Sequence, residues 1–107
     1  MTTFDDRERA FEAKFAHDAE MQFKAEARRN RLLGLWAAGL MGKTGAEADA
    51  YAREVITADF QEAGEEDVFR KVRPDLTDRV TDAQLRDQMR TLMAQAKSQI
   101  LEEVDIP

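Results

Sequence analysis

The chain has no cysteine, only one histidine and a single serine, Ser98. Without cysteine there is neither a disulfide framework nor a thiolate metal site, which is usual for proteins of a reducing compartment. The lone His17 has no second histidine with which to build a zinc site. With no cysteine and a single serine, the chain also has few candidate nucleophiles for covalent catalysis. These absences argue against an enzyme and against a bound metal.

Long hydrophobic runs are missing as well. The longest uncharged stretch, Leu32 to Gly42, has 11 residues, well short of the roughly 18 to 20 that span a bilayer. Asp5 and Asp6 fall where a secretory signal would carry positive charge. Residues 1–20 carry three basic side chains against six acidic ones, the wrong sign for a helix bound to anionic lipid. We therefore expect a cytoplasmic protein that does not insert into the membrane.

What the chain does have is charge and helix-forming residues. Charged residues make up 36% of its 107 residues and apolar residues 43%, with a formal net charge of -6. The bias is toward Ala, Leu, Glu, Arg, Lys, Gln and Met, which lose least on entering a helix. A negative chain is a poor general binder of nucleic acid, because phosphate contacts need a basic face. Composition and length thus predict one all-α domain.

The first predicted helix is unusually long, from about Asp5 to Leu40. Phe4, Phe11 and Phe15 share one of its faces at spacings of seven and four. The apolar stripe continues at spacing four and then broadens; its members are Ala19, Phe23, Ala27, Leu32, Leu33, Leu35, Trp36 and Leu40.

Three further helices follow from local signals. Gly42 terminates the first helix, and Thr44 with Glu47 forms a capping box for a second helix that ends at Gly64. A short third helix begins at Glu65 and ends before Pro74.

Thr81 with Gln84 caps the last helix, and Val80 is placed to pack on Leu85. The predicted core stripe of this helix is Leu85, Met89, Leu92, Met93, Ala96 and Ile100. We thus expect a four-helix bundle with one short helix and a long or mobile N-terminal helix.

Length points to a function for the N-terminal segment. At about 1.5 Å per residue, a helix from Asp5 to Leu40 is roughly 54 Å long, whereas the second and fourth helices span about 30 to 35 Å. About the first 15 residues would then project beyond the bundle, with their phenylalanines available as a helix-in-groove ligand. Alternatively, the segment bends near residues 16–18 and folds back, or is disordered until it binds. From these helix lengths we expect two parts, an N-terminal arm, residues 1–18, and a bundle, residues 19–107.

Three segments carry a resemblance to a known family: Phe4 to Glu12, Leu33 to Ala38 and the Lys43-Thr44-Gly45 turn. The chain resembles the zeta subunit of alphaproteobacterial F-type ATP synthases, an inhibitor of ATP hydrolysis, over essentially its whole length. The resemblance implies that the arm enters a catalytic interface between the alpha and beta subunits near gamma, which would place the protein at the inner membrane peripherally, through the ATP synthase. Apolar anchoring would fall to Phe4, Phe11 and Phe15, and polar contacts to Asp5, Arg7, Glu8, Arg9, Glu12 and Lys14.

A nucleotide-sensing adaptor is the rival interpretation, since the resemblance also implies a regulatory ADP or ATP site, although no cofactor is required. The candidate phosphate ligands are either Lys24, Arg28 and Arg31, on one helix face, or Lys43 beside the start of the second helix. A solvated charged face explains the first set better than a phosphate site does. Gly42-Lys43-Thr44 fails as a phosphate-binding loop because Ala37 stands where that motif has glycine. Trp36 is expected in the core rather than stacked on a base.

Overall fold

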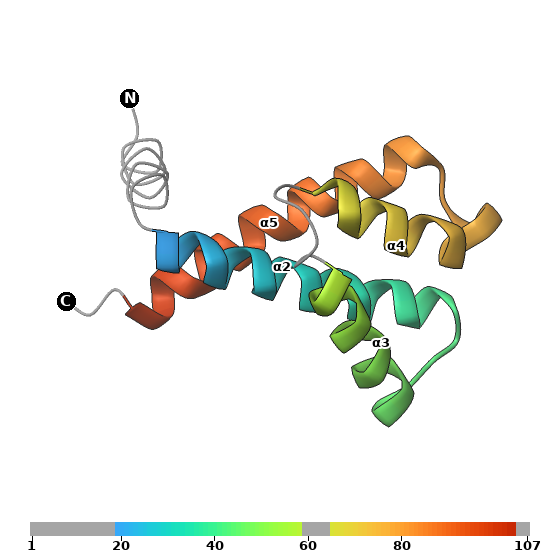
Figure 1. Ribbon diagram of the computed structural model, residues 1–107, viewed down its shortest axis with the longest axis horizontal. Coiled ribbons are helices and arrows are strands. Elements are labelled where there is room, and N and C mark those ends of the chain that lie inside the picture. The colour runs from blue at the N-terminus through green and yellow to red at the C-terminus, as the bar shows by residue number, and fades with distance from the viewer. Residues whose placement is uncertain (1–18, 59–64, 105–107) are drawn as a thin grey trace.

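The computed structural model describes residues 19–58 and 65–104, and these form four α-helices and one 3-10 turn (Figure 1). The elements are α2 (Ala19–Leu40), α3 (Gly45–Ala58), α4 (Glu66–Leu76), η1 (Thr77–Arg79) and α5 (Asp82–Val104). No strand occurs within these two ranges. The predicted all-α class and the number of bundle helices are confirmed. The long first helix is described from Ala19 onward, and the predicted end of the second helix at Gly64 lies outside the described residues.

Helices α2 and α5 form a long antiparallel pair (Figure 1). At one end Arg28 of α2 meets Glu103 of α5, and at the other Arg79, just before α5, donates to the carbonyl of Leu40 at 2.8 Å. Helices α3 and α4 pack against the half of this pair that contains the end of α2 and the start of α5. We call this half the main body, and the half formed by the start of α2 and the end of α5 the outer end.

The core has two parts, one in each half. The main cluster joins all four helices and comprises Leu33, Ala37, Ala38, Tyr51, Val55, Val68, Val72, Leu76, Leu85, Met89 and Leu92. The outer cluster is small, with Met21, Ala25 and Ile100 buried and Met93 partly buried against them. The stripe predicted for α5 is therefore confirmed, because all its members are buried except the partly buried Met93.

The apolar stripe predicted at the start of α2 is not the buried face. Phe23 is 53% exposed and Ala19 is exposed, whereas Met21 and Ala25 face α5. Spacing alone identified a row of apolar residues, but the position of α5 selects the neighbouring row for burial.

The end of α2 confirms the role predicted for Gly42. This glycine has φ +80, and its N–H donates to the carbonyl of Gly39, while the N–H of Lys43 donates to Ala38 at 2.8 Å. This pair of bonds satisfies the last carbonyls of the helix in the Schellman pattern. The lysine that resembled a phosphate-loop lysine therefore belongs to a helix terminator.

The two predicted capping boxes differ in outcome. At α5 the Thr81 N–H donates to the Gln84 side chain at 2.8 Å and the Gln84 N–H donates to the Thr81 hydroxyl at 3.1 Å, as predicted. At α3 the Glu47 N–H donates to the backbone carbonyl of Thr44, so that turn is closed by backbone alone.

The third helix runs further than predicted, because Pro74 lies inside α4 rather than beyond it. Proline lacks an N–H, but in the last turn this removes one bond from a helix that is about to end. Burial of Leu76 in the main cluster holds the final residues in helical form. Thr77, with φ 47, then breaks the helix.

Candidate functional site

The arm carries the residues to which the inhibitory contacts were assigned, and all of them lie outside the described residues. They are Phe4, Asp5, Arg7, Glu8, Arg9, Phe11, Glu12, Lys14 and Phe15. The structure describes the body to which the arm is attached. The arm joins α2 at Ala19, at the tip of the outer end and away from α3 and α4 (Figure 1).

The outer end is closed by polar contacts as well as by its small apolar cluster. The Arg28 guanidinium donates to both carboxylate oxygens of Glu103, one of them at 2.8 Å, and to the amide oxygen of Gln99 at 3.4 Å. This two-point geometry suits a guanidinium better than an ammonium. The hydrogen bond from Arg28 lowers the pKa of the Glu103 carboxyl, and the same contact raises the pKa of Arg28.

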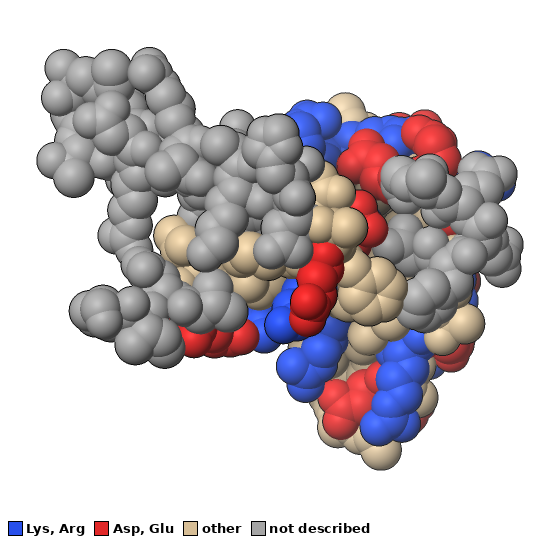
Figure 2. All heavy atoms as spheres, turned by 60° about the vertical axis from the view of Figure 1, so that its left-hand side comes forward, with Lys and Arg blue, Asp and Glu red and all other residues tan. Residues whose placement is uncertain are grey.

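The three basic residues proposed for a nucleotide differ in their surroundings. Lys24 pairs with Glu20 at 3.6 Å, as its spacing predicts, and Arg28 is held by Glu103. Arg31 is exposed. The structure thus gives two members of this set carboxylate partners within the chain. On the face shown in Figure 2, basic and acidic side chains also lie next to one another.

The alternative phosphate ligand, Lys43, lies at the other end of α2. From Lys24 to Leu40 the helix rises by about 24 Å, and Lys43 follows that end. Lys43 therefore belongs to the main body, and the two proposals describe separate places. Trp36, the candidate for base stacking, is partly buried against the main cluster, as expected.

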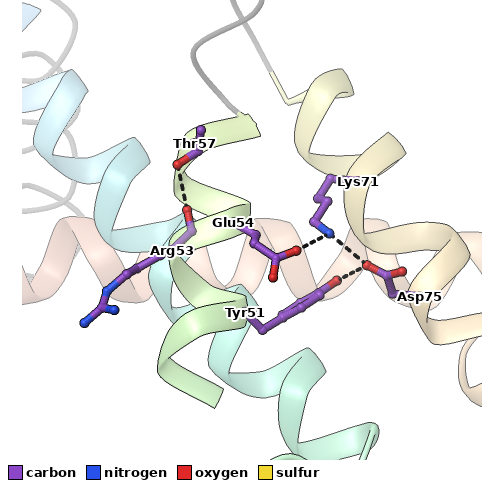
Figure 3. A network of polar contacts seen from close by, with 6 residues as sticks. All are labelled: Tyr51, Arg53, Glu54, Thr57, Lys71 and Asp75. Carbon is purple, nitrogen blue, oxygen red and sulfur yellow. Dashed lines mark hydrogen bonds and ion pairs between the residues drawn. The ribbon is translucent and has the colours of Figure 1, made fainter. Parts of the chain in front are cut away.

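A network between α3 and α4 was not predicted (Figure 3). The Tyr51 hydroxyl donates to the Asp75 carboxylate at 2.7 Å. Lys71 donates to the same carboxylate at 3.2 Å and to Glu54 at 2.9 Å, and its ammonium lies 4.9 Å from the centre of the Tyr51 ring. Burial and the bond to Asp75 raise the pKa of Tyr51 well above its ordinary value. The spacing of Lys71 and Asp75 was visible in the sequence, but the approach of Tyr51 from another helix was not.

The acidic residues at the start of α4 also form ion pairs. Arg86 of α5 pairs with Glu66 at 2.9 Å and with Glu65 at 3.3 Å, and its guanidinium stacks 3.9 Å from the centre of the Phe69 ring. Asp67 pairs with Arg70.

Within residues 19–58 and 65–104 no group of His, Asp and Glu is arranged to hold a metal ion. No helix in those ranges is long and apolar enough to cross a membrane.

Comparison with known proteins gives a family and a structure. A family model described as ATPase inhibitor subunit zeta matches residues 1–99, a range that includes both the arm and nearly all of the bundle. A structure solved by solution NMR is 57% identical, covers 78% of this chain and 99% of its own, and superimposes with a TM-score of 0.72. A search of curated proteins gives no match.

Proposed function

The chain belongs to the ATPase inhibitor subunit zeta family, and from this premise we propose that its arm, residues 1–18, blocks ATP hydrolysis by entering a catalytic alpha/beta interface of the F-type ATP synthase near gamma. The family makes an ATP synthase the partner and a regulatory role the function. The assignment of the inhibitory contact to the residues of the arm is our proposal. The observation that carries it is that the family match begins at residue 1 and so extends over the arm together with the bundle.

The arrangement of the bundle supports this division of labour. Among the described residues, the two core clusters extend from Met21 to Ile100 and include members of all four helices. The arm leaves from the tip of α2 at the outer end. An arm attached there can enter an interface while α3 and α4 remain outside it. Its three phenylalanines provide the apolar anchors that a helix-in-groove ligand needs.

Deleting residues 2–15 tests the proposal. We expect the truncated protein to keep a folded bundle that unfolds cooperatively, and to lose inhibition of ATP hydrolysis by an ATP synthase stripped of its own inhibitor. In the full chain, changing Phe4, Phe11 and Phe15 to Ala should raise the concentration for half-inhibition by at least about 30-fold, since one buried interface anchor contributes on the order of 2 kcal/mol.

The matched control is Arg90→Ala, which removes an exposed charge paired with Asp87 on α5. It should inhibit like the unmodified chain. Full inhibition by the truncated bundle would refute the assignment to the arm. Loss of inhibition in a Lys24→Ala/Arg31→Ala variant whose arm is intact would favour the nucleotide-sensing adaptor instead.

A further inference from the structure

Thr77, at the end of α4, has a backbone conformation that is normally reserved for glycine. Its φ is 47 and its ψ is -116, and within residues 19–58 and 65–104 it is the one non-glycine residue with positive φ. The first central position of a type II′ turn has such angles and takes glycine. A side chain branched at Cβ fits this region poorly, because its Cβ crowds the neighbouring peptide groups. The joint between α4 and η1 is therefore strained.

Two apolar side chains fix the chain on either side of the strained residue. Leu76, directly before it, is fully buried in the main cluster, and Val80 is partly buried against the same cluster. Only the three residues of η1, Thr77–Arg79, connect these two points. The chain must therefore turn within three residues. Backbone strain persists where the surrounding structure over-determines the conformation in this way.

Two arginines also contact the strained residue. Arg73 of α4 donates to the Thr77 carbonyl at 3.0 Å and to the carboxylate of Asp82, in the first turn of α5. Arg79 donates to the Thr77 hydroxyl at 3.4 Å and to the carbonyl of Leu40, the last residue of α2, at 2.8 Å. Each guanidinium thus connects Thr77 to another helix, and the joint ties the end of α4 to the end of α2 and to the start of α5.

The contacts of the two arginines and the strain at Thr77 are of comparable size. Arg79 is exposed and the Arg73 side chain is 29% exposed, so their hydrogen bonds compete with water. One such hydrogen bond, like one strained backbone residue, changes a folding equilibrium by a factor on the order of ten. The closed joint is therefore balanced, and the arginine contacts decide whether it stays closed.

We infer that Arg73, Thr77 and Arg79 form a strained latch, which the two arginines hold closed and which opens when their contacts are lost. In the open arrangement Thr77 relaxes to an ordinary backbone conformation. The end of α2 and the start of α5 then lose the bonds that connect them to the end of α4. The inference concerns the bundle and is independent of the contact proposed for the arm.

A pair of glycine substitutions in the full chain tests the strain. Thr77→Gly removes the crowded Cβ and should raise the folding equilibrium constant at least about threefold, even though glycine also loosens the unfolded chain. The matched control is Asp78→Gly, at the next exposed position, where φ is not positive. There glycine relieves no strain and should lower the constant about two- to fivefold. Urea unfolding measures both. If Thr77→Gly lowered the constant as Asp78→Gly does, the latch would be refuted.

Amide hydrogen exchange, followed by NMR, tests the role of the arginines. The reporters are the amides of Gln84 and Leu85, which donate to the hydroxyl and the carbonyl of Thr81 at the start of α5. In Arg73→Ala/Arg79→Ala they should exchange at least about ten times faster than in the unmodified chain. The amide of Phe69, bonded to Glu65 at the other end of α4, should stay within about twofold.

Adding Thr77→Gly to the double arginine variant separates a strained latch from a simple loss of contacts. If strain opens the joint, glycine at this position should return the exchange of the Gln84 and Leu85 amides to within about threefold of the unmodified chain. Exchange that stays fast after this addition, or that is not accelerated by removing the arginines, would overturn the inference. If the double arginine variant does not fold, the opposite effects expected of Thr77→Gly and Asp78→Gly still decide.

Discussion

Single residues show how a contact across helices changes the chemistry of a side chain. Tyr51 belongs to the main cluster, with 4% of its surface exposed. Burial and the hydrogen bond to Asp75 both favour the neutral phenol, because the carboxylate would repel a tyrosinate. Lys71 shows the opposite balance: burial lowers its pKa, but the bonds to Glu54 and Asp75 outweigh burial and raise it.

The titration of Tyr51 is a direct test of this network, because it is the chain's one tyrosine. Its pKa is raised above the ordinary 10.0, so the stability it contributes is complete below that pH and is lost as the pH rises. We expect tyrosinate absorbance to appear together with the loss of helical circular dichroism. In Asp75→Asn the tyrosine should titrate at lower pH but still above its ordinary value, since burial remains. A folded protein whose tyrosine titrates near 10.0 would contradict the network.

At the scale of helices, the packing of α2 on α3 depends on one glycine. A Cβ built on Gly34 would lie 2.6 Å from the Cα of Ala52 on α3. Because the obstructing atom is backbone, no side-chain rotation relieves the contact, and the two helices would have to separate. Gly34 thus allows a close helix crossing, whereas Gly39 of the same helix faces open space.

Two alanine substitutions in α2 should therefore have opposite effects. Gly34→Ala should lower the free energy of unfolding by about 1–3 kcal/mol, because overpacking outweighs the better helix propensity of alanine. Gly39→Ala gains the propensity without the clash and should raise stability by about 0.5–1 kcal/mol. Urea unfolding measures both. If Gly34→Ala proved as stable as Gly39→Ala, the close crossing of α2 and α3 would be wrong.

At the scale of the whole molecule, ion pairs tie together helices that are distant in the sequence. Arg28 to Glu103 closes the outer end, Arg86 to Glu65 and Glu66 joins α5 to the start of α4, and Arg73 to Asp82 joins α4 to α5. These pairs lie at the surface, so each contributes little by itself. Together they affect how the free energy of unfolding depends on pH.

We predict that the protein loses stability in acid partly through Glu66 and Glu103. Hydrogen bonds from Arg86 and Arg28 lower the pKa of these two carboxyls below their ordinary 4.5. A lowered native pKa contributes stability that is complete above the unfolded value and is lost as the pH falls through the native one. The variant Glu66→Gln/Glu103→Gln should therefore show a flatter fall in unfolding free energy between about pH 5 and pH 3.

Urea unfolding at a series of pH values measures that slope, with Glu102→Gln as the control because it alters an exposed carboxylate beside Glu103. The control should follow the unmodified chain. An acid slope in the double variant equal to that of the unmodified chain would show that the two pairs do not contribute to it.

Much of the fold was predictable from local sequence. The all-α class, the terminator at Gly42, the capping box of Thr81 with Gln84 and the buried stripe of α5 were all predicted and confirmed. These features depend on backbone conformation and on spacings of three or four residues. The pair of Lys24 with Glu20 was predictable for the same reason. The candidate site was harder to predict, because the carboxylate that binds Arg28 lies 75 residues away in the sequence.

Sequence alone determined which segments are helical and how α2 and α5 end or begin, because those properties arise from neighbouring residues. Tertiary structure decided which row of α2 is buried, so that Met21 and Ala25 rather than Phe23 face α5. It also kept Pro74 inside α4, since the burial of Leu76 offsets a lost hydrogen bond. The two clusters of the α2–α5 pair became visible only in three dimensions, because they depend on which side chains of α3 and α4 pack against the pair.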